Sequence, residues 1–233
     1  MVGDILNAAF ELYKRHWKHL MSVALAFYLI AGTITLGLTI AFGRWGALGG
    51  AIVLLIGIFW LTGALVEAVA DIRDGRVEMP WNETFSRVWP RVWPLLGASI
   101  LAGLGIAVGL ALLIVPGLIL LTWWALLAPA VVLEKRDVFD SFRRSRELVR
   151  GNAWSVFGVL IITYLLTSVV SGVIRAIFTP LPDYLGQYIA DVIGGTVVAP
   201  FSALAITLMY FRLAGPETTP ESVPEALPPP EPR

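Results

Sequence analysis

Apolar stretches long enough to cross a lipid bilayer recur along this chain, and they leave little choice of fold class. A hydrocarbon core of about 30 Å needs about 20 helical residues for one crossing. Hydrophobic residues make up 57% of the chain and charged residues 15%, against about 45–50% and about 25% in soluble domains. We therefore expect an all-α integral membrane protein. The predicted transmembrane helices are residues 20–42, 46–70, 94–115, 117–134, 154–178 and 184–211.

Short turns join these six stretches in pairs. The turn sequences are GRWG at 43–46, VPG at 115–117 and TPLPD at 179–183. Pro116 suits the first turn of the fourth helix, where its missing N–H leaves no hydrogen bond unmade. The sequence therefore predicts three transmembrane hairpins within residues 1–213, followed by a Pro- and Glu-rich tail, 214–233, that we expect to be disordered.

The positions of Lys and Arg predict how the helices are oriented. Every Lys and Arg except Arg44 and Arg175 lies before the first stretch, between the second and third, between the fourth and fifth, or after the sixth. Because cytoplasmic loops are enriched in Lys and Arg, we expect both termini on the cytoplasmic side.

A segment with the pattern of an amphipathic interfacial helix precedes each hairpin. In residues 137–152, Asp137 is the predicted N-cap and Gly151 suits the end of the helix. The face that we expect to be buried consists of Val138, Phe142, Ser145 and Val149.

The other two segments follow the same plan. In residues 4–17 Asp4 is the predicted cap, and the side expected to be buried carries Ile5, Ala9, Leu12 and Trp17. The middle segment has Asn82 as its cap, Phe85, Val88 and Val92 inward, and Pro90 as a helix breaker. The plan predicts a threefold internal repeat over 1–70, 81–134 and 137–213. The alternative is that these are the amphipathic connectors of any multi-span protein.

The third interfacial segment carries an unusual number of cations, namely Lys135, Arg136, Arg143, Arg144, Arg146 and Arg150. Asp140 with Arg144 and Arg143 with Glu147 are spaced i, i+4, so part of this charge is expected to be neutralised locally. One interpretation is a topology determinant on a solvated helix face. The other is binding of anionic lipid head groups, to which each cation contributes about 1 kcal/mol. The patch is small and adjoins a bilayer, so no nucleic-acid partner is predicted.

The stretch from Val115 to Gly158 resembles the bacterial glycerophosphoryl diester phosphodiesterase membrane-domain family and the related YciC-like uncharacterised membrane proteins. The residues that carry the resemblance are Pro116-Gly117, Pro129, Glu134, Ser141, Arg144-Ser145 and LVRGNAW at 148–154, with weaker support from ILNAAFELYKRHW at the front. The resemblance implies a multi-pass protein of the bacterial inner membrane with a role there. It carries over no catalytic residues, because this chain has no room for the phosphodiesterase barrel.

Catalytic and cofactor motifs are scarce in this sequence. The chain has no Cys, and its two histidines, His16 and His19, have no third ligand nearby in the sequence. No GxxxxGK[ST] phosphate-binding loop occurs. The GxxxG at 105–109 indicates close helix packing. We therefore predict no enzyme activity, no cofactor and no metal site.

Several polar side chains fall within the apolar stretches, where ionisable groups are costly unless paired. On the fifth predicted helix, Tyr164, Ser168, Ser171 and Arg175 share one face. On the sixth, a weaker stripe is formed by Asp191, Gly195, Val198 and Ser202. Arg175 and Asp191 are predicted to pair, either as a structural ion pair or as part of a polar path, and snorkelling of Arg175 is a further alternative. Glu67 is expected to reach the interface or a neighbouring helix.

The sequence thus predicts a non-enzymatic, lipid-interacting accessory or scaffold protein. The alternative function is a small transporter or channel subunit with a polar path along the fifth and sixth helices. Membrane lipids are the expected partners, and the sequence specifies neither a protein partner nor an oligomeric state.

Overall fold

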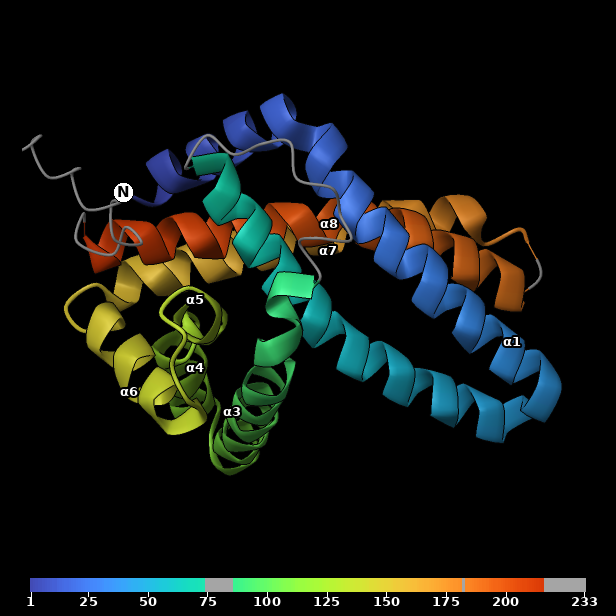
Figure 1. Ribbon diagram of the computed structural model, residues 1–233, viewed down its shortest axis with the longest axis horizontal. Helices are drawn as coiled ribbons and strands as arrows, with labels where there is room; N and C mark the ends of the chain where they lie inside the picture. Colours follow the sequence, from blue (N-terminus) through green and yellow to red (C-terminus); the bar gives the residue numbers. More distant parts are fainter. Residues whose placement is uncertain (74–85, 182, 216–233) are drawn as a thin grey trace, which may run out of the picture.

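The computed structural model describes residues 1–73, 86–181 and 183–215, and every regular element in these ranges is a helix (Figure 1). Five helical stretches in them are long and apolar enough to cross a membrane. These observations confirm the all-helical class and support its placement in a membrane.

The first element, α1 (Val2–Arg73), is not one straight helix. Its backbone leaves helical geometry at His16 and at Gly43, where φ is 55° and ψ is −133°. Glycine tolerates this left-handed φ because it has no Cβ. Figure 1 shows the chain reversing direction within α1. We call residues 2–15 the N-terminal segment, 17–42 the first arm and 44–73 the second arm.

The second part of the chain begins with a short helical turn at 86–88 and the 3-10 turn η1 (Trp89–Arg91), which contains Pro90. Helix α3 (Val92–Leu112) follows, and the backbone of the next residue, Leu113, is extended. Helix α4 (Ile114–Trp123) starts at once. The reversal is therefore at Leu113 rather than at VPG, and Pro116 lies in the first turn of α4.

The span predicted at 117–134 corresponds to the apolar stretch Ile114–Val132, but this stretch is not one regular helix, because a turn at 124–126 separates α4 from α5 (Leu127–Val132). Pro129 explains the break. It has no N–H to bond the carbonyl four residues earlier, and its ring clashes with that carbonyl. In the first turn of a new helix neither problem arises. Pro129 therefore restarts the helix instead of kinking it.

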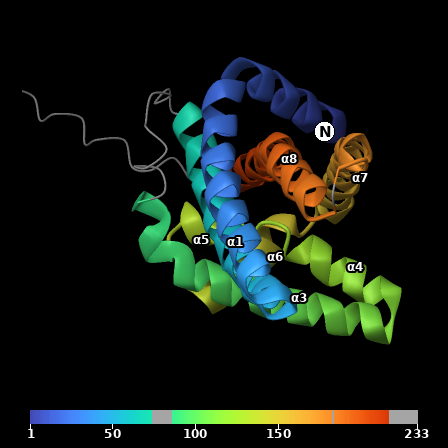
Figure 2. The same ribbon diagram turned by 90° about the vertical axis from the view of Figure 1, so that its right-hand side faces the viewer.

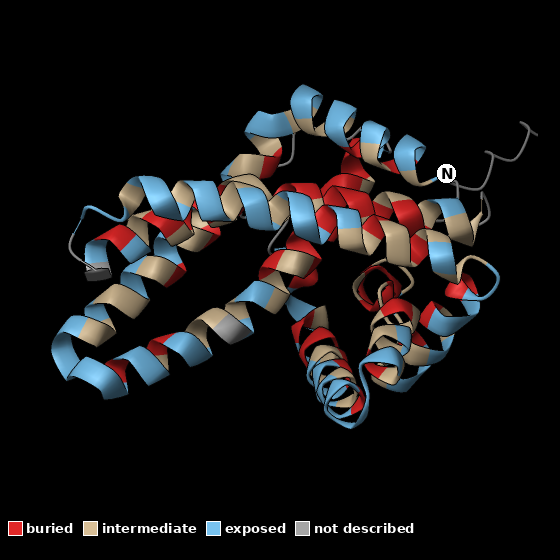
Figure 3. Ribbon diagram, turned by 180° about the vertical axis from the view of Figure 1, so that it is seen from behind, coloured by how far each residue is buried: buried red, intermediate tan, exposed pale blue. Residues whose placement is uncertain are grey.

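Three further helices complete the bundle: α6 (Val138–Val149), α7 (Ala153–Phe178) and α8 (Asp183–Ala214). Helix α8 continues through Pro200. Figure 2 shows α8 between α1 and α7, with α3 and α4 set to one side. Buried residues gather around α8, whereas the reversal of α1 is largely exposed (Figure 3).

The predicted caps and buried faces are only partly correct. Asp137 occupies the N-cap of α6 but makes no capping hydrogen bond, and Asp4 lies inside α1, where it pairs with the N-terminal ammonium at 2.9 Å. Gly151 ends α6 with φ 87° as expected. Trp17 is 48% exposed, against the prediction.

Several residues of the predicted buried faces are buried in the structure. Ile5 and Ala9 are buried in the N-terminal segment, and so are Val88 and Val92 in the middle one. The predicted Asn82 cap and Phe85 lie outside the described residues. On α6 the buried residues are Ser141, Ser145, Leu148 and Val149, and Val138 and Phe142 are half-buried.

The two ends of the described chain lie together. The Asp4 carboxylate is 3.8 Å from Arg212 in the last turn of α8, and further along, the Tyr13 hydroxyl donates to the carbonyl of Val197 in the middle of α8 over 3.0 Å. Arg73, at the end of α1, lies 4.0 Å from the centroid of the Phe211 ring. We call this end of the bundle, to which α6 also contributes, the basic end.

Candidate functional site

Ser145 holds α6 against the break between α4 and α5. Its hydroxyl donates to the Trp123 carbonyl over 2.7 Å and accepts from the Leu126 N–H over 3.1 Å. Ser145 is fully buried. One side chain thus bonds two backbone groups that the interrupted helix leaves free, as buried backbone groups require.

Glu134 lies at the centre of a second set of contacts at the basic end. One carboxylate oxygen accepts hydrogen bonds from Arg144 Nε and from the Tyr210 hydroxyl, both 2.7 Å long, and the other accepts from Arg136 Nε. The Glu134 side chain is only 11% exposed and that of Arg144 22%. Burial raises the pKa of Glu134, but the hydrogen bonds from Arg144, Tyr210 and Arg136 outweigh it and hold the pKa below its ordinary value.

These contacts divide the six predicted lipid-binding cations into two that Glu134 binds and four that it does not. Arg136 and Arg144 are engaged by Glu134, and Arg146 lies 4.3 Å from the centroid of the Trp123 ring. The predicted Asp140–Arg144 pair is therefore wrong. Arg143 pairs with Asp140 at 3.1 Å and with Glu147 at 3.9 Å.

The exposed cations and an exposed aromatic side chain share one face of α6. Phe139 is 80% exposed and precedes Arg143, Arg146 and Arg150 by four, seven and eleven residues, which places all four on one side of the helix. The buried serines lie on another side. Trp154, just after α6, is 87% exposed.

Lys135 stands in the turn between α5 and α6. Its φ is 54°, an uncommon value for a residue with a side chain, and its carbonyl accepts a 3.2 Å hydrogen bond from Arg91. The Lys135 side chain is exposed and has no partner among the described residues.

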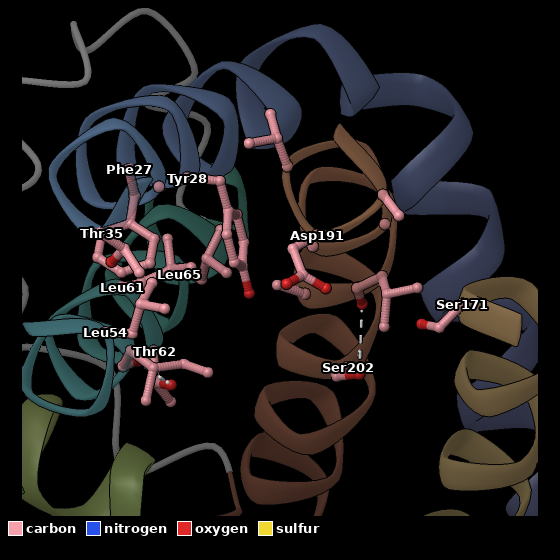
Figure 4. Close-up of a pocket in the computed structure, with 18 of the residues that line it drawn as sticks. Phe27, Tyr28, Thr35, Leu54, Leu61, Thr62, Leu65, Ser171, Asp191 and Ser202 are labelled. Carbon is pink, nitrogen blue, oxygen red and sulfur yellow. Dashed lines mark hydrogen bonds between the residues drawn. The ribbon is translucent and has the colours of Figure 1, made fainter. Parts of the chain in front are cut away.

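A second candidate site is a cavity of about 810 Å³ between the two arms of α1 and α8, reached also by α5 and α7. Figure 4 shows Asp191 of α8 facing the space into which Tyr28 of the first arm projects, with Leu61 and Leu65 of the second arm across it. The wall is mostly apolar, with polar side chains among the aliphatic ones.

The two predicted polar stripes differ in how many of their residues line this cavity. All four residues of the α8 stripe, from Asp191 to Ser202, line the cavity, although this stripe was the weaker prediction. Of the α7 stripe only Ser171 and Arg175 do, while Tyr164 and Ser168 are exposed elsewhere on α7. The predicted Arg175–Asp191 pair is present, with Nη2 2.8 Å from Oδ1. Glu67 is half-buried outside the lining.

Two tyrosines outside the predicted polar stripes fix the first arm against α8. The Tyr28 ring lies against Gly195, where an added Cβ would be 2.2 Å from the ring. Tyr188 lies against Gly32 in the same way, and its hydroxyl is 3.2 Å from that of Thr33. Tyrosines facing glycines on a distant helix leave no periodic signal, so only the presence of several glycines in these stretches hinted at such contacts.

The GxxxG of α3 also packs closely, as predicted. A Cβ at Gly105 would be 2.6 Å from the Trp124 ring, and one at Gly109 would be 2.9 Å from the Cα of Gly117 on α4. Within the described ranges no three His, Asp or Glu side chains gather as a metal site.

Comparison with known proteins gives one family match. Residues 82–213 match the family model described as "Domain of unknown function (DUF7847)". The specific resemblance to the phosphodiesterase membrane-domain and YciC-like proteins is not confirmed by this match. No curated protein and no solved structure matches the chain. The matched region includes the contacts of Ser145 and Glu134, but the α1 arms of the cavity lie outside it.

Proposed function

The chain belongs to the DUF7847 family, and we propose that it is a non-enzymatic, lipid-interacting accessory or scaffold protein of the bacterial inner membrane. In this proposal it crosses the bilayer six times, once with each arm of α1, with α3, with α4 and α5 together, with α7 and with α8. Both termini are cytoplasmic, and the cations of α6 contact anionic lipid head groups.

The arrangement of the ends supports this topology. Asp4 of the N-terminal segment meets Arg212 in the last turn of α8 at the basic end, as an even number of crossings requires. Arg44 follows the reversal of α1, and Arg175 lies in the last turn of α7, so both exceptions to the charge bias fall at helix ends away from the basic end. This agrees with the tendency of cytoplasmic segments to carry the cations.

The single observation that carries the lipid-binding role is the outward face of α6. A helix held in place by its buried serines presents Phe139 beside Arg143, Arg146 and Arg150. A Phe ring can insert at the boundary between head groups and acyl chains, as on other interfacial helices, and guanidinium groups suit lipid phosphates. Arg143 pairs only with exposed acids of its own helix, and Phe139 and Arg150 are exposed, which favours a membrane surface as their contact.

The test replaces three of the four cations that make no contact with Glu134, and it keeps Arg146 because its guanidinium lies over the Trp123 ring. In the triple variant Lys135→Gln, Arg143→Gln and Arg150→Gln, each lost charge is worth about 1 kcal/mol, so retention of phosphatidylglycerol should weaken by up to about 100-fold. The measurement is mass spectrometry of phosphatidylglycerol that stays with the protein after purification from nanodiscs of defined composition.

Arg44→Gln is the matched control, because it removes an exposed cation away from the basic end. It should leave retained phosphatidylglycerol unchanged. Equal retention by the triple variant and the wild type would reject a head-group role for this face. Arg136 and Arg144 are left intact, since changing them would disturb the contacts of Glu134.

A second candidate function, transport of a polar solute, rests on the ion pair in the cavity wall. Ser171, Arg175 and Asp191 all line the cavity and would form the path. On this hypothesis Asp191→Asn abolishes flux in proteoliposomes while the fold is intact, and undiminished flux rejects the path.

A further inference from the structure

The large cavity is joined to a smaller one. A hollow of about 320 Å³ is lined by the last turn of α7, the α7–α8 connection and the start of α8, and it shares Arg175, Gln187 and Ala190 with the wall of the large cavity. Thr179 also lines it. The two spaces therefore lie side by side, with Arg175 in the wall of both and its partner Asp191 in the wall of the large one.

The large cavity is long enough for an acyl chain. Its lining on α8 runs from Gln187 past Asp191 to Ile206, and at about 1.5 Å per residue the part beyond Asp191 extends about 22 Å. One leaflet occupies about half of a hydrocarbon core of about 30 Å. Small side chains keep the space open, namely Ala47, Ala51, Ala128, Ala199 and Ala203.

The hydroxyl groups along this length do not make it a polar channel. Thr35, Thr39 and Thr62 donate to carbonyls of their own helix over 2.9, 2.8 and 2.7 Å, and Ser202 does so over 3.3 Å. A hydroxyl that bonds its own turn presents mainly carbon to its surroundings. The cavity beyond the ion pair therefore suits a hydrocarbon chain better than a polar solute.

The charges at the junction are balanced and partly unused. The Arg175–Asp191 contact joins one guanidinium nitrogen to one carboxylate oxygen. Arg175 lines both hollows, and Asp191 lines the large one. Arginine retains further N–H donors, and the second carboxylate oxygen retains its lone pairs. Such a pair offers a donor array for a phosphate next to an acceptor for an ammonium group, with no net charge to favour an anion.

We propose that this site binds one zwitterionic phospholipid of the ethanolamine type. One acyl chain fills the large cavity between the arms of α1 and α8. The head group lies where the two hollows adjoin, with its phosphate on Arg175, which lines both, and its ammonium on Asp191, which lines the large cavity. The proposal rests on the bilayer placement proposed above but uses none of the α6 cations, so the two lipid sites can fail independently.

The first experiment fills the chain site. The double variant Ala51→Phe and Ala199→Phe puts aromatic rings into the cavity, and Ala107→Phe adds a ring on an exposed face of α3 outside the lining as the control. Each full-length protein is reconstituted in nanodiscs of equal parts dioleoyl-phosphatidylethanolamine and dioleoyl-phosphatidylglycerol, released into detergent, and analysed by native mass spectrometry.

The wild type and Ala107→Phe should each retain one phosphatidylethanolamine, and the double variant should retain about tenfold less, equivalent to 1.4 kcal/mol. Equal retention by all three proteins overturns the proposal, and so does a retained polypeptide in place of lipid. Circular dichroism establishes that the double variant is folded. If it is not, Ala51→Phe alone gives the same comparison.

The second experiment tests the head-group assignment without filling the cavity. Asp191→Asn leaves Arg175 uncompensated, so the bound lipid should shift from phosphatidylethanolamine toward phosphatidylglycerol by about tenfold in ratio. Arg175→Gln should lose both lipids. An unchanged ratio in Asp191→Asn overturns the assignment. The triple variant of α6 should leave this one lipid in place, which separates failure here from failure of the proposed function.

Discussion

Ser145→Ala should destabilise the protein far more than the same substitution four residues earlier. The Ser145 hydroxyl bonds the Leu126 N–H and the Trp123 carbonyl, which belong to the break between α4 and α5. Alanine fits the space but makes neither bond. Leaving a buried polar group unpaired costs about 1–3 kcal/mol, so two such groups predict a loss of about 2–5 kcal/mol.

Ser141→Ala is the control. Ser141 is equally buried on the same helix, and its hydroxyl donates to the Asp137 carbonyl over 2.8 Å. That carbonyl also accepts the Ser141 N–H over 3.0 Å, so it keeps a partner in the variant. The expected loss is about 0.5–1.5 kcal/mol, the net worth of one ordinary hydrogen bond.

The assay is unfolding in mixed micelles with a rising fraction of sodium dodecyl sulfate, followed by circular dichroism. Both variants and the wild type are compared under identical conditions. Losses of stability that agree within about 0.5 kcal/mol would refute the reasoning, because the orphaned backbone groups would then carry no cost.

Three further predictions follow from described contacts. Glu134→Gln should lower the free energy of unfolding by about 1–3 kcal/mol in the same assay, because Arg144 then keeps its charge without its partner; no loss would contradict a stabilising role for the pair. The pKa of Glu134 is lowered in the folded protein, so the contribution of its carboxylate to the free energy of unfolding is fully present above the ordinary pKa of 4.5. That contribution is lost as the pH falls through the lowered pKa. The wild type should therefore lose more stability than Glu134→Gln between pH 6 and pH 3. Gly195→Ala should destabilise by about 1–3 kcal/mol because its Cβ meets the Tyr28 ring, whereas Gly194→Ala, with its nearest neighbour at 3.9 Å, should be neutral or stabilising; equal melting temperatures would count against the tight contact.

Hydrophobic length and turn residues were enough to predict the helical class and most helix positions. They could not place the break before Pro129 correctly, because a proline late in an apolar run fits either a kink or a new helix start. A new helix start is stabilised here by Ser145, whose hydroxyl accepts the Leu126 N–H from a helix about 20 residues further along the chain. The threefold repeat stays a prediction.

At the candidate sites too, spacing predicted some side-chain contacts and missed others. Spacing predicted the Arg175–Asp191 pair correctly, because the two residues flank a short hairpin turn. It assigned Arg144 to Asp140, the nearest acid at i, i+4, whereas the structure gives it to Glu134, a more buried carboxylate shared with Tyr210. Local spacing cannot predict a partner that reaches the site from another helix, and the same holds for Tyr28 and Tyr188.

The hydrogen bond from Tyr13 to Val197 joins residues 184 positions apart, so the N-terminal segment can form this contact only after α8 has been synthesised. At about 5–20 residues per second, the ribosome delivers the acceptor roughly 10–40 s after the donor. Throughout that interval the apolar side of residues 2–15 lacks its final contact and must rest on lipid or on an assisting protein. Docking of the N-terminal segment, which is synthesised first, is thus among the last events of assembly. Truncating α8 would remove the helix surface against which this segment packs.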